Sequence, residues 1–167
     1  MTRPDNLILI GMPGVGKSTA GVLLAKADSR DFLDTDVVIQ AREGRRLQDI
    51  LDRDGIAAFC QLEERHILAL APHNAVIATG GSAVYSDRAM QHLRGLGLVV
   101  FLDAPLAVLE ARLTDLDRRG VVKPAGLSLA DLYAERLPLY RRYAHATVAC
   151  GHLTHLQTVA AILAAGT

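Results

Sequence analysis

Residues 11–19 read Gly-Met-Pro-Gly-Val-Gly-Lys-Ser-Thr, which has the residue types and the spacing of a phosphate-binding loop. Its glycines allow the backbone to curl until successive N–H groups point inward at phosphate oxygens. The lysine can reach the β- and γ-phosphates, and the serine hydroxyl can ligate Mg²⁺. We therefore expect a nucleoside triphosphate and Mg²⁺ as cofactors. The predicted nucleotide-binding residues of the loop are Gly11, Gly14, Val15, Gly16, Lys17, Ser18 and Thr19.

The segments beside this loop predict the elements that would position it. Residues 6–10 form a short apolar run, as expected for a buried parallel strand. Residues 19–27 read as a helix, and the positive end of its dipole would face the phosphates. A plain glycine turn is the alternative interpretation, and the strand and helix beside the loop argue against it.

Two carboxylates, Asp34 and Asp36, follow the second predicted strand. Side chains at positions i and i+2 of a strand point to the same side. Near a phosphate loop, one carboxylate can hold Mg²⁺ and the other can accept a proton from a substrate hydroxyl. A helix N-cap or a turn is the alternative, because aspartate favours both. Gly80 and Gly81 follow the third predicted strand and would allow close approach of a ligand, or form a simple turn.

Apolar strand-like runs alternate with helical ones along the whole chain, which predicts an α/β fold with a parallel sheet covered on both faces. The predicted strands are residues 7–10, 32–34, 75–78, 98–102 and 146–148. The predicted helices are residues 19–27, 47–51, 56–70, 87–93, 105–113, 128–143 and 153–164. Residues 114–127 are polar and without periodicity, and we expect them to form a lid loop over the site.

The composition narrows the class of protein. The length of 167 residues predicts a single domain. The formal net charge is zero, which argues against a nucleic-acid partner. The N-terminal apolar stretch is too short for a signal peptide or a membrane span. The two cysteines suit a reducing compartment. We expect a cytoplasmic monomer that binds no nucleic acid and no membrane.

Four motifs in order resemble the shikimate kinases, small members of the P-loop kinase group. Besides the phosphate loop they are Phe-Leu-Asp-Thr-Asp at 32–36, Ala-Thr-Gly-Gly at 78–81 and Glu-Arg-Leu-Pro-Leu-Tyr at 135–140. The resemblance covers nearly the whole chain. It implies a three-layer P-loop kinase fold with a five-stranded parallel sheet and a lid. It also implies ATP-dependent phosphoryl transfer to a hydroxyl of a small carboxylate metabolite, with shikimate as the default acceptor.

The resemblance also implies roles for single residues. Ser18 and Asp34 would hold Mg²⁺, and Asp36 would bind the acceptor and take its proton. Lys17 and the lid arginine would act in catalysis; Arg119 is the first choice for the latter and Arg118 the alternative. The nucleotide is expected to contact three further residues, Arg112, Arg118 and Arg119. The acceptor is expected to contact Gly80, Gly81, Ser82, Cys60 and Arg136. Among these, Arg136 would be the clamp on the acceptor's carboxylate.

The sequence departs from the family pattern on the acceptor side, in a region we place at about residues 36–65. The family helix reads G-E-x-x-F-R-x-x-E, whereas this chain has Ile56 in place of the glutamate and Cys60 in place of the arginine. Ser82 replaces a third glycine, and the lid reads Arg-Gly-Val-Val at 119–122 instead of R-P-L-L. Ile56 and Cys60 share one helix face, so this face lacks both the glutamate and the arginine of the family pattern.

In the family, the arginine that Cys60 replaces binds the shikimate carboxylate together with the arginine that corresponds to Arg136. One charge-assisted hydrogen bond is worth roughly 1.5–3 kcal/mol, so its loss weakens shikimate binding on the order of 10–100-fold unless another group replaces it. The acceptor is thus either shikimate, bound in a site where another group replaces the lost arginine, or another hydroxy acid. Homoserine is the first alternative. A non-catalytic nucleotide-binding module is the second alternative.

Overall fold

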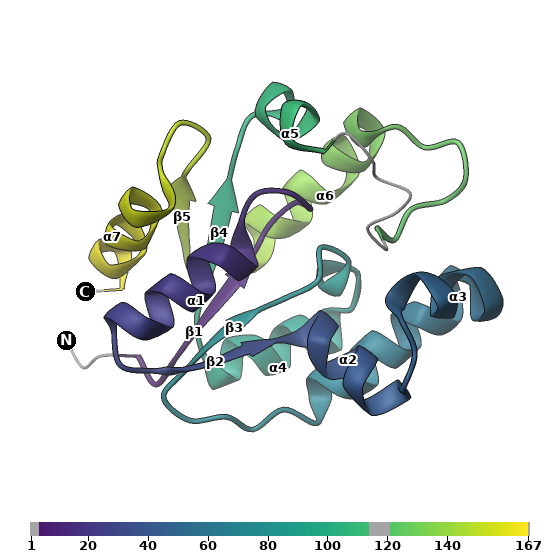
Figure 1. The fold of residues 1–167 in the computed structure, drawn as a ribbon, viewed down its shortest axis with the longest axis horizontal. Coiled ribbons are helices and arrows are strands. Elements are labelled where there is room, and N and C mark those ends of the chain that lie inside the picture. The colour runs from purple at the N-terminus through teal and green to yellow at the C-terminus, as the bar shows by residue number, and fades with distance from the viewer. Residues whose placement is uncertain (1–3, 114–120, 167) are drawn as a thin grey trace.

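The computed structural model describes residues 4–113 and 121–166. One parallel sheet with strand order β2-β3-β1-β4-β5 forms its centre (Figure 1). The strand that leads into the phosphate loop is the middle one, and the strand order reverses beside it, where α/β sheets bind their ligands. All five predicted strands are confirmed to within one residue. They are β1 (Asn6–Ile10), β2 (Asp31–Asp34), β3 (Ala75–Ala78), β4 (Gly97–Asp103) and β5 (Ala146–Ala149).

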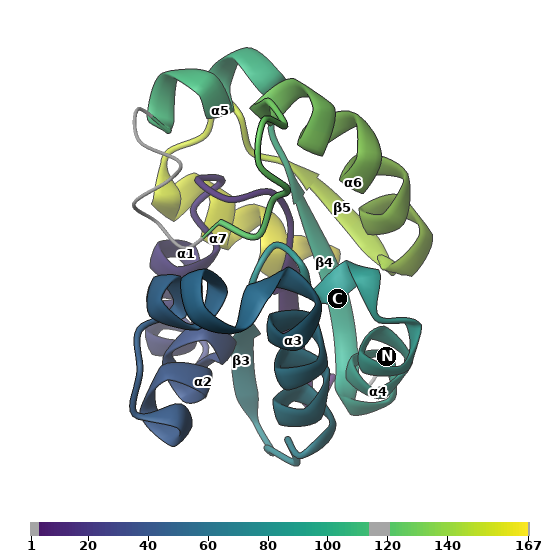
Figure 2. The same cartoon turned by 90° about the vertical axis from the view of Figure 1, so that its right-hand side faces the viewer.

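Helices cover both faces of the sheet, which confirms the α/β fold. Helices α1 and α7 pack together on one face, whereas α4 and α6 lie on the other (Figures 1 and 2). Helices α2 and α3 pack against each other beside β2 and α4. The helices are α1 (Lys17–Ala27), α2 (Thr35–Glu43), α3 (Leu47–Leu68), α4 (Asp87–Leu96), α5 (Leu106–Arg112), α6 (Leu129–Tyr143) and α7 (His155–Ala165), with a short 3₁₀ helix η1 (Ala83–Tyr85).

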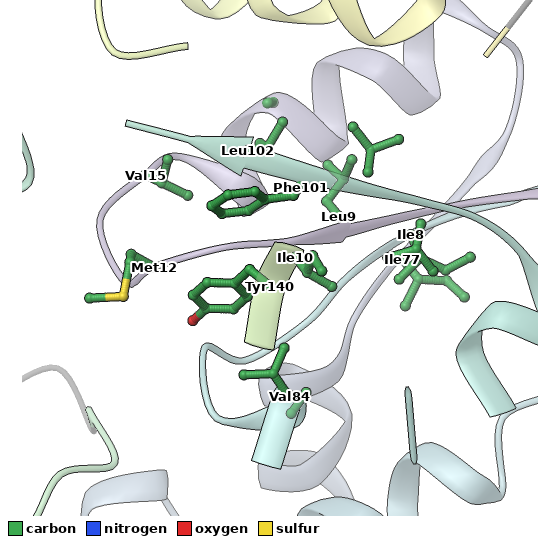
Figure 3. Packing of buried hydrophobic residues seen from close by; sticks show 14 of the residues in the cluster. Ile8, Leu9, Ile10, Met12, Val15, Ile77, Val84, Phe101, Leu102 and Tyr140 are labelled. Carbon is green, nitrogen blue, oxygen red and sulfur yellow. The ribbon is translucent and has the colours of Figure 1, made fainter. Parts of the chain in front are cut away.

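The main core lies between the sheet and these helices and fixes the ends of the central strands. The residues of β1 and β3 are all buried, as a strand covered on both faces requires. Phe101 of β4 stacks on Tyr140 of α6 with ring centroids 5.1 Å apart (Figure 3). The Tyr140 hydroxyl donates a hydrogen bond to the carbonyl oxygen of Gly81 at 2.7 Å. This contact ties the core directly to the glycine turn after β3.

Helix α2 was not predicted, and its presence changes the interpretation of the two aspartates. The helix begins at Thr35, immediately after β2, so Asp36 lies in its first turn and not on a strand. Asp34 is the N-cap: its Oδ1 accepts hydrogen bonds from the backbone N–H groups of Asp36 at 2.9 Å and Val37 at 3.4 Å. The expectation that strand alternation aligns the two carboxylates was therefore wrong. The N-cap alternative is correct for Asp34.

The two helices predicted at 47–51 and 56–70 are joined as α3, with a break at Gly55, whose φ of 83° lies in the left-handed region. A second hydrophobic cluster, separate from the main core, holds α2 and α3 together. Its buried members are Ile39, Leu47, Ile50, Phe59 and Val122. The predicted acceptor region thus has a small core of its own. Within the described ranges, none of the helices has the length and apolar character needed to span a membrane.

Candidate active site

A cavity of about 1000 Å³ opens at the carboxyl ends of the central strands. The phosphate loop lines one part of it, together with Arg112 and the start of α7. Asp36, the turn at residues 80–82 and Arg136 line another part. The structure therefore brings together most of the predicted nucleotide-side and acceptor-side residues in one space. Arg118 and Arg119 lie outside the described residues, so their predicted contacts stay predictions.

The phosphate loop depends on glycine at the predicted positions. Gly11, Gly14 and Gly16 have φ values of 148°, 79° and 102°, which other residues rarely adopt. A Cβ on Gly11 would also lie 2.7 Å from the carbonyl oxygen of Leu102. Gly16 is the N-cap of α1 and supplies no side-chain cap, so the first N–H groups of that helix remain available to an anion. Val15 is buried and anchors the loop in the core.

Lys17 is buried at the start of α1. Its Nζ donates hydrogen bonds to the carbonyl oxygens of Gly11 at 2.7 Å and Met12 at 2.9 Å. Burial lowers the pKa of Lys17 to about 8, while the nearby carboxylates of Asp36 and Asp34 act against this shift. The ammonium group is thus held over the loop, where it can neutralise bound phosphate.

Ser18 and Asp34 form a pair of oxygen donors beside the loop. The Ser18 hydroxyl donates to Asp34 Oδ2 at 2.6 Å, and Asp34 is itself oriented by its N-cap hydrogen bonds. Mg²⁺ is typically bound by one or two protein oxygens together with substrate phosphates. No group of three or more potential metal-ligating side chains occurs in the described part of the chain. The Ser18–Asp34 pair therefore fits a Mg²⁺ ion that is shared with a nucleotide.

Asp36, which was predicted to bind the acceptor, lies beside the turn at Gly80. Its Oδ1 would be only 2.7 Å from a Cβ on Gly80, so a side chain at this position would displace the carboxylate. Burial, reinforced by the charge of Asp34, raises the pKa of Asp36 to about 6. A carboxylate whose pKa is moved towards neutrality is a better general base than an ordinary aspartate.

Arg136 of α6 is fully buried at the edge of the cavity. Its Nε donates to the Tyr85 hydroxyl at 3.0 Å, its Nη2 donates to the carbonyl oxygen of Val122, and its guanidinium lies over the Tyr85 ring at 5.0 Å. Its Nη1 would be 2.9 Å from a Cβ on Gly81. Among the described residues it forms no ion pair with a carboxylate. A buried cation of this kind is a ready partner for an anionic ligand.

Arg112 lines the cavity beside the phosphate loop, and its Nη1 donates to the Val15 carbonyl oxygen at 3.3 Å. Leu153, Thr154 and His155 line the cavity nearby. His155 lies against Gly16 and Leu113 against Gly14, so this part of the cavity borders the phosphate loop. Of the predicted lid, residues 121–127 are described, and Val121 lines the cavity.

The acceptor side contains Glu63, which the sequence reasoning did not select. Glu63 lies on α3, one helical turn after Cys60, and its side chain is buried. The Ser82 hydroxyl donates to its Oε2 at 2.6 Å, whereas its Oε1 is buried without a hydrogen-bond partner. Burial and the charge of Asp36 raise the pKa of Glu63 to about 7. Glu63 occupies the position of the last glutamate in the family pattern G-E-x-x-F-R-x-x-E, and this match was the sequence signal for it.

Cys60 lines a different, smaller cavity of about 160 Å³, together with Glu63, Ser82 and Tyr85. Burial raises the pKa of the Cys60 thiol, and the charge of Glu63 acts in the same direction. Ser82 lines both cavities, so the two spaces adjoin at the glycine turn. Cys60 is thus close to the acceptor side, but it is not among the residues that line the larger cavity.

The comparisons with known proteins agree with this geometry. A family model described as shikimate kinase matches residues 13–166. The shikimate kinase of Thiobacillus denitrificans is 40% identical over 152 residues, which cover 89% of this chain and 82% of that protein. Shikimate kinase 2 of Enterobacter sp. (strain 638) is 35% identical over 153 residues, or 89% of this chain and 87% of that protein.

Solved structures show the same likeness. The structure of Acinetobacter baumannii shikimate kinase in complex with shikimate matches with a TM-score of 0.88 and 30% identity, over 95% of this chain and 90% of that one. Aquifex aeolicus shikimate kinase matches with a TM-score of 0.82 and 31% identity, over 96% and 95% of the two chains. The chain therefore belongs to the shikimate kinase family.

Proposed function

We propose that this protein transfers the γ-phosphoryl group of ATP to a hydroxyl group of a small carboxylate-bearing acceptor. The observation that carries the proposal is the placement of Arg136. This buried guanidinium has no carboxylate partner among the described residues, and it borders the same cavity as the phosphate loop and Asp36. An acceptor carboxylate at Arg136 would direct the rest of the molecule towards Asp36 and the phosphates.

The residues of the chain divide the chemistry between them. Asp36 accepts the proton of the acceptor hydroxyl, whose oxygen then forms the new bond to the γ-phosphorus as the bond to ADP breaks. Lys17 and the N–H groups at the start of α1 neutralise charge on the phosphates. Ser18 and Asp34 would hold Mg²⁺, which supplies further charge neutralisation when it is bound. Arg112 would contact the nucleotide near its base.

Shikimate is the first acceptor to test, because the similar proteins are shikimate kinases and one of them was solved with shikimate bound. Homoserine is the second, because Cys60 stands where the family pattern has an arginine and only Arg136 remains as a carboxylate clamp. We propose that the enzyme acts as a single-domain, cytoplasmic monomer without a nucleic-acid partner. Its zero net charge supports the absence of a nucleic-acid partner, and its two free cysteines suit a reducing compartment.

A coupled assay of ADP release tests the function directly. Purified protein with ATP and Mg²⁺ is screened against shikimate, homoserine and related hydroxy acids, with Lys17→Ala as the inactive control. We expect one of these acceptors to raise ADP release well above the rate without acceptor. Binding of ATP with no stimulation by any acceptor would contradict the proposal and favour the non-catalytic module.

A further inference from the structure

The acceptor side contains a buried carboxylate whose hydrogen-bonding capacity is only half used. Glu63 has 2% of its surface exposed, and only its Oε2 has a partner, the Ser82 hydroxyl. Its Oε1 is the one buried side-chain oxygen or nitrogen in the described residues that has no hydrogen-bond partner. Leaving such a group unpaired costs free energy, so an unpaired oxygen at this place indicates a missing donor.

The missing donor belongs beside the glycine turn. A Cβ on Gly80 would lie 2.7 Å from both Glu63 Oε1 and Asp36 Oδ1, so the two carboxylates border the same small space. The next residue, Gly81, is equally close to Arg136 Nη1, at 2.9 Å from the corresponding Cβ position. Neighbouring Cα atoms are about 3.8 Å apart. The turn therefore has two carboxylates beside Gly80 and a guanidinium group beside the next residue, Gly81.

This charge pattern suits a zwitterion better than a simple acid. An α-amino acid has its carboxylate and its ammonium group on one carbon, so it can meet Arg136 and Glu63 at the same time. An acid without an amine would satisfy Arg136 but leave Glu63 unpaired and its own carboxylate near a second negative charge. Complementary charges of this kind select ligands more than they add affinity.

The neighbourhood of Cys60 supports the same interpretation. Cys60 and Glu63 line the cavity of about 160 Å³ next to the turn, and a thiol there supplies no cation for Glu63. Arg136 is a charged neighbour of Glu63. Its Nε and Nη2 donate their hydrogen bonds to Tyr85 and Val122, not to Glu63. Among the described residues no cationic group donates a hydrogen bond to Glu63 Oε1, so a ligand can supply that donor.

We propose that Glu63 binds the ammonium group of the acceptor, which makes the acceptor a small hydroxy amino acid with its carboxylate on Arg136 and its hydroxyl at Asp36. This inference rests on the proposed phosphoryl transfer to a small hydroxy acid. In the free protein Glu63 Oε1 is covered, so the proposal requires the carboxylate to turn about its soft terminal torsion towards the larger cavity when the acceptor binds. Ser82 can donate to the other oxygen.

Two acceptors and two proteins test the proposal. Homoserine and 4-hydroxybutyrate differ only in the amine, and Glu63→Gln removes the negative charge with little change of shape. We measure kcat/KM for both acceptors, and homoserine binding by calorimetry, in the wild type and in this variant. Glu110→Gln, at an exposed carboxylate on α5, is the matched control.

The wild type should prefer homoserine over 4-hydroxybutyrate by about 10- to 100-fold, the effect of one hydrogen bond to a charged group. Glu63→Gln should abolish this preference by weakening only homoserine, with the KM for ATP unchanged. Equal losses for both acceptors in Glu63→Gln would show a merely structural role and overturn the proposal. Efficient turnover of shikimate or 4-hydroxybutyrate, with homoserine a poor acceptor, would also overturn it but leave the proposed phosphoryl transfer intact.

Absence of stimulation by every acceptor would instead refute the proposed function itself. If Glu63→Gln does not fold, Cys60→Arg provides the second test. An arginine at this position would pair with Glu63 and compete with the ammonium group of the acceptor. Cys60→Arg should therefore lower kcat/KM for homoserine at least 10-fold and raise it for shikimate. An unchanged ratio of the two values would contradict the role of Glu63.

Discussion

Replacing Glu63 by glutamine should stabilise the free protein at neutral and alkaline pH. Burial of this carboxyl group, together with the nearby charge of Asp36, raises its pKa from 4.5 to about 7, and its Oε1 has no hydrogen-bond partner. At about 1.4 kcal/mol per pKa unit, the charged form is disfavoured in the folded state by about 3 kcal/mol. Glutamine has nearly the same shape and no charge, and it can still accept the hydrogen bond from Ser82.

The pH range follows from the direction of the shift. Below pH 4.5 Glu63 is protonated in both folded and unfolded states, so the charge contributes no difference there. As the pH rises through 7, the unfolded state is already ionised and the folded state loses the advantage of binding the proton. The wild type thus loses stability relative to Glu63→Gln between pH 4.5 and 7, up to about 3 kcal/mol. The charged and titratable groups around Glu63 are Asp36, Arg136 and Cys60, and all three remain in the variant.

Urea unfolding at several pH values between 5 and 8 measures the difference. Glu110→Gln, which removes a charge from an exposed position on α5, is the control and should show almost no pH-dependent difference from the wild type. A gap between wild type and Glu63→Gln that stays constant or narrows as the pH rises would refute this account. In that case Glu63 would already be well solvated or paired in the folded protein.

Three further substitutions test the site. Lys17→Ala should lower kcat by at least about 10²-fold with an unchanged circular dichroism spectrum, since it removes charge neutralisation at the phosphates; a residual rate above about a tenth would contradict this role. Asp36→Asn should lower kcat by roughly 10²–10⁴-fold while calorimetry shows nearly unchanged ATP affinity, and weaker ATP binding with a normal kcat would refute the general-base assignment. Gly80→Ala should abolish acceptor turnover but spare ATP binding, because the new Cβ would lie 2.7 Å from the oxygens of both Asp36 and Glu63; normal acceptor kinetics would show that the turn has room to yield.

The sheet and the phosphate loop could be predicted because their signals are local. Strands covered on both faces read as apolar runs, and the loop needs glycine at fixed positions that no other residue type can fill. Helix α2 was missed although its boundary signals are present. Asp34 caps its N-terminus and Gly44, with a φ of 63°, ends it. Between them the sequence Thr-Asp-Val-Val-Ile-Gln-Ala-Arg-Glu has only one fully buried apolar residue, Ile39, so it shows little periodicity.

The candidate site was predictable only where a motif named the residue. Asp36 and Arg136 border the cavity as expected, although Asp36 does so from a helix and not from a strand end. Glu63 matches the last glutamate of the family helix pattern, but that match did not give it a predicted role. Its importance follows from burial, from the missing partner of Oε1 and from the proximity of Gly80, all of which are tertiary properties. A sequence shows that an arginine has become Cys60, but not which carboxylate this change leaves without a cation.

The two hydrophobic clusters explain how the acceptor side can change while the nucleotide side does not. Met12 and Val15 of the phosphate loop pack into the main core with the sheet. Ile56 and Cys60 instead pack against the second cluster, which joins α2, α3 and Val122. We therefore expect substitutions at these two positions to alter the packing around α2 and α3 and to leave the phosphate loop in place. The same division predicts that Cys60→Arg changes the choice of acceptor and leaves the KM for ATP as it is, whereas a coupled loss of ATP affinity would show that the two clusters do not act independently.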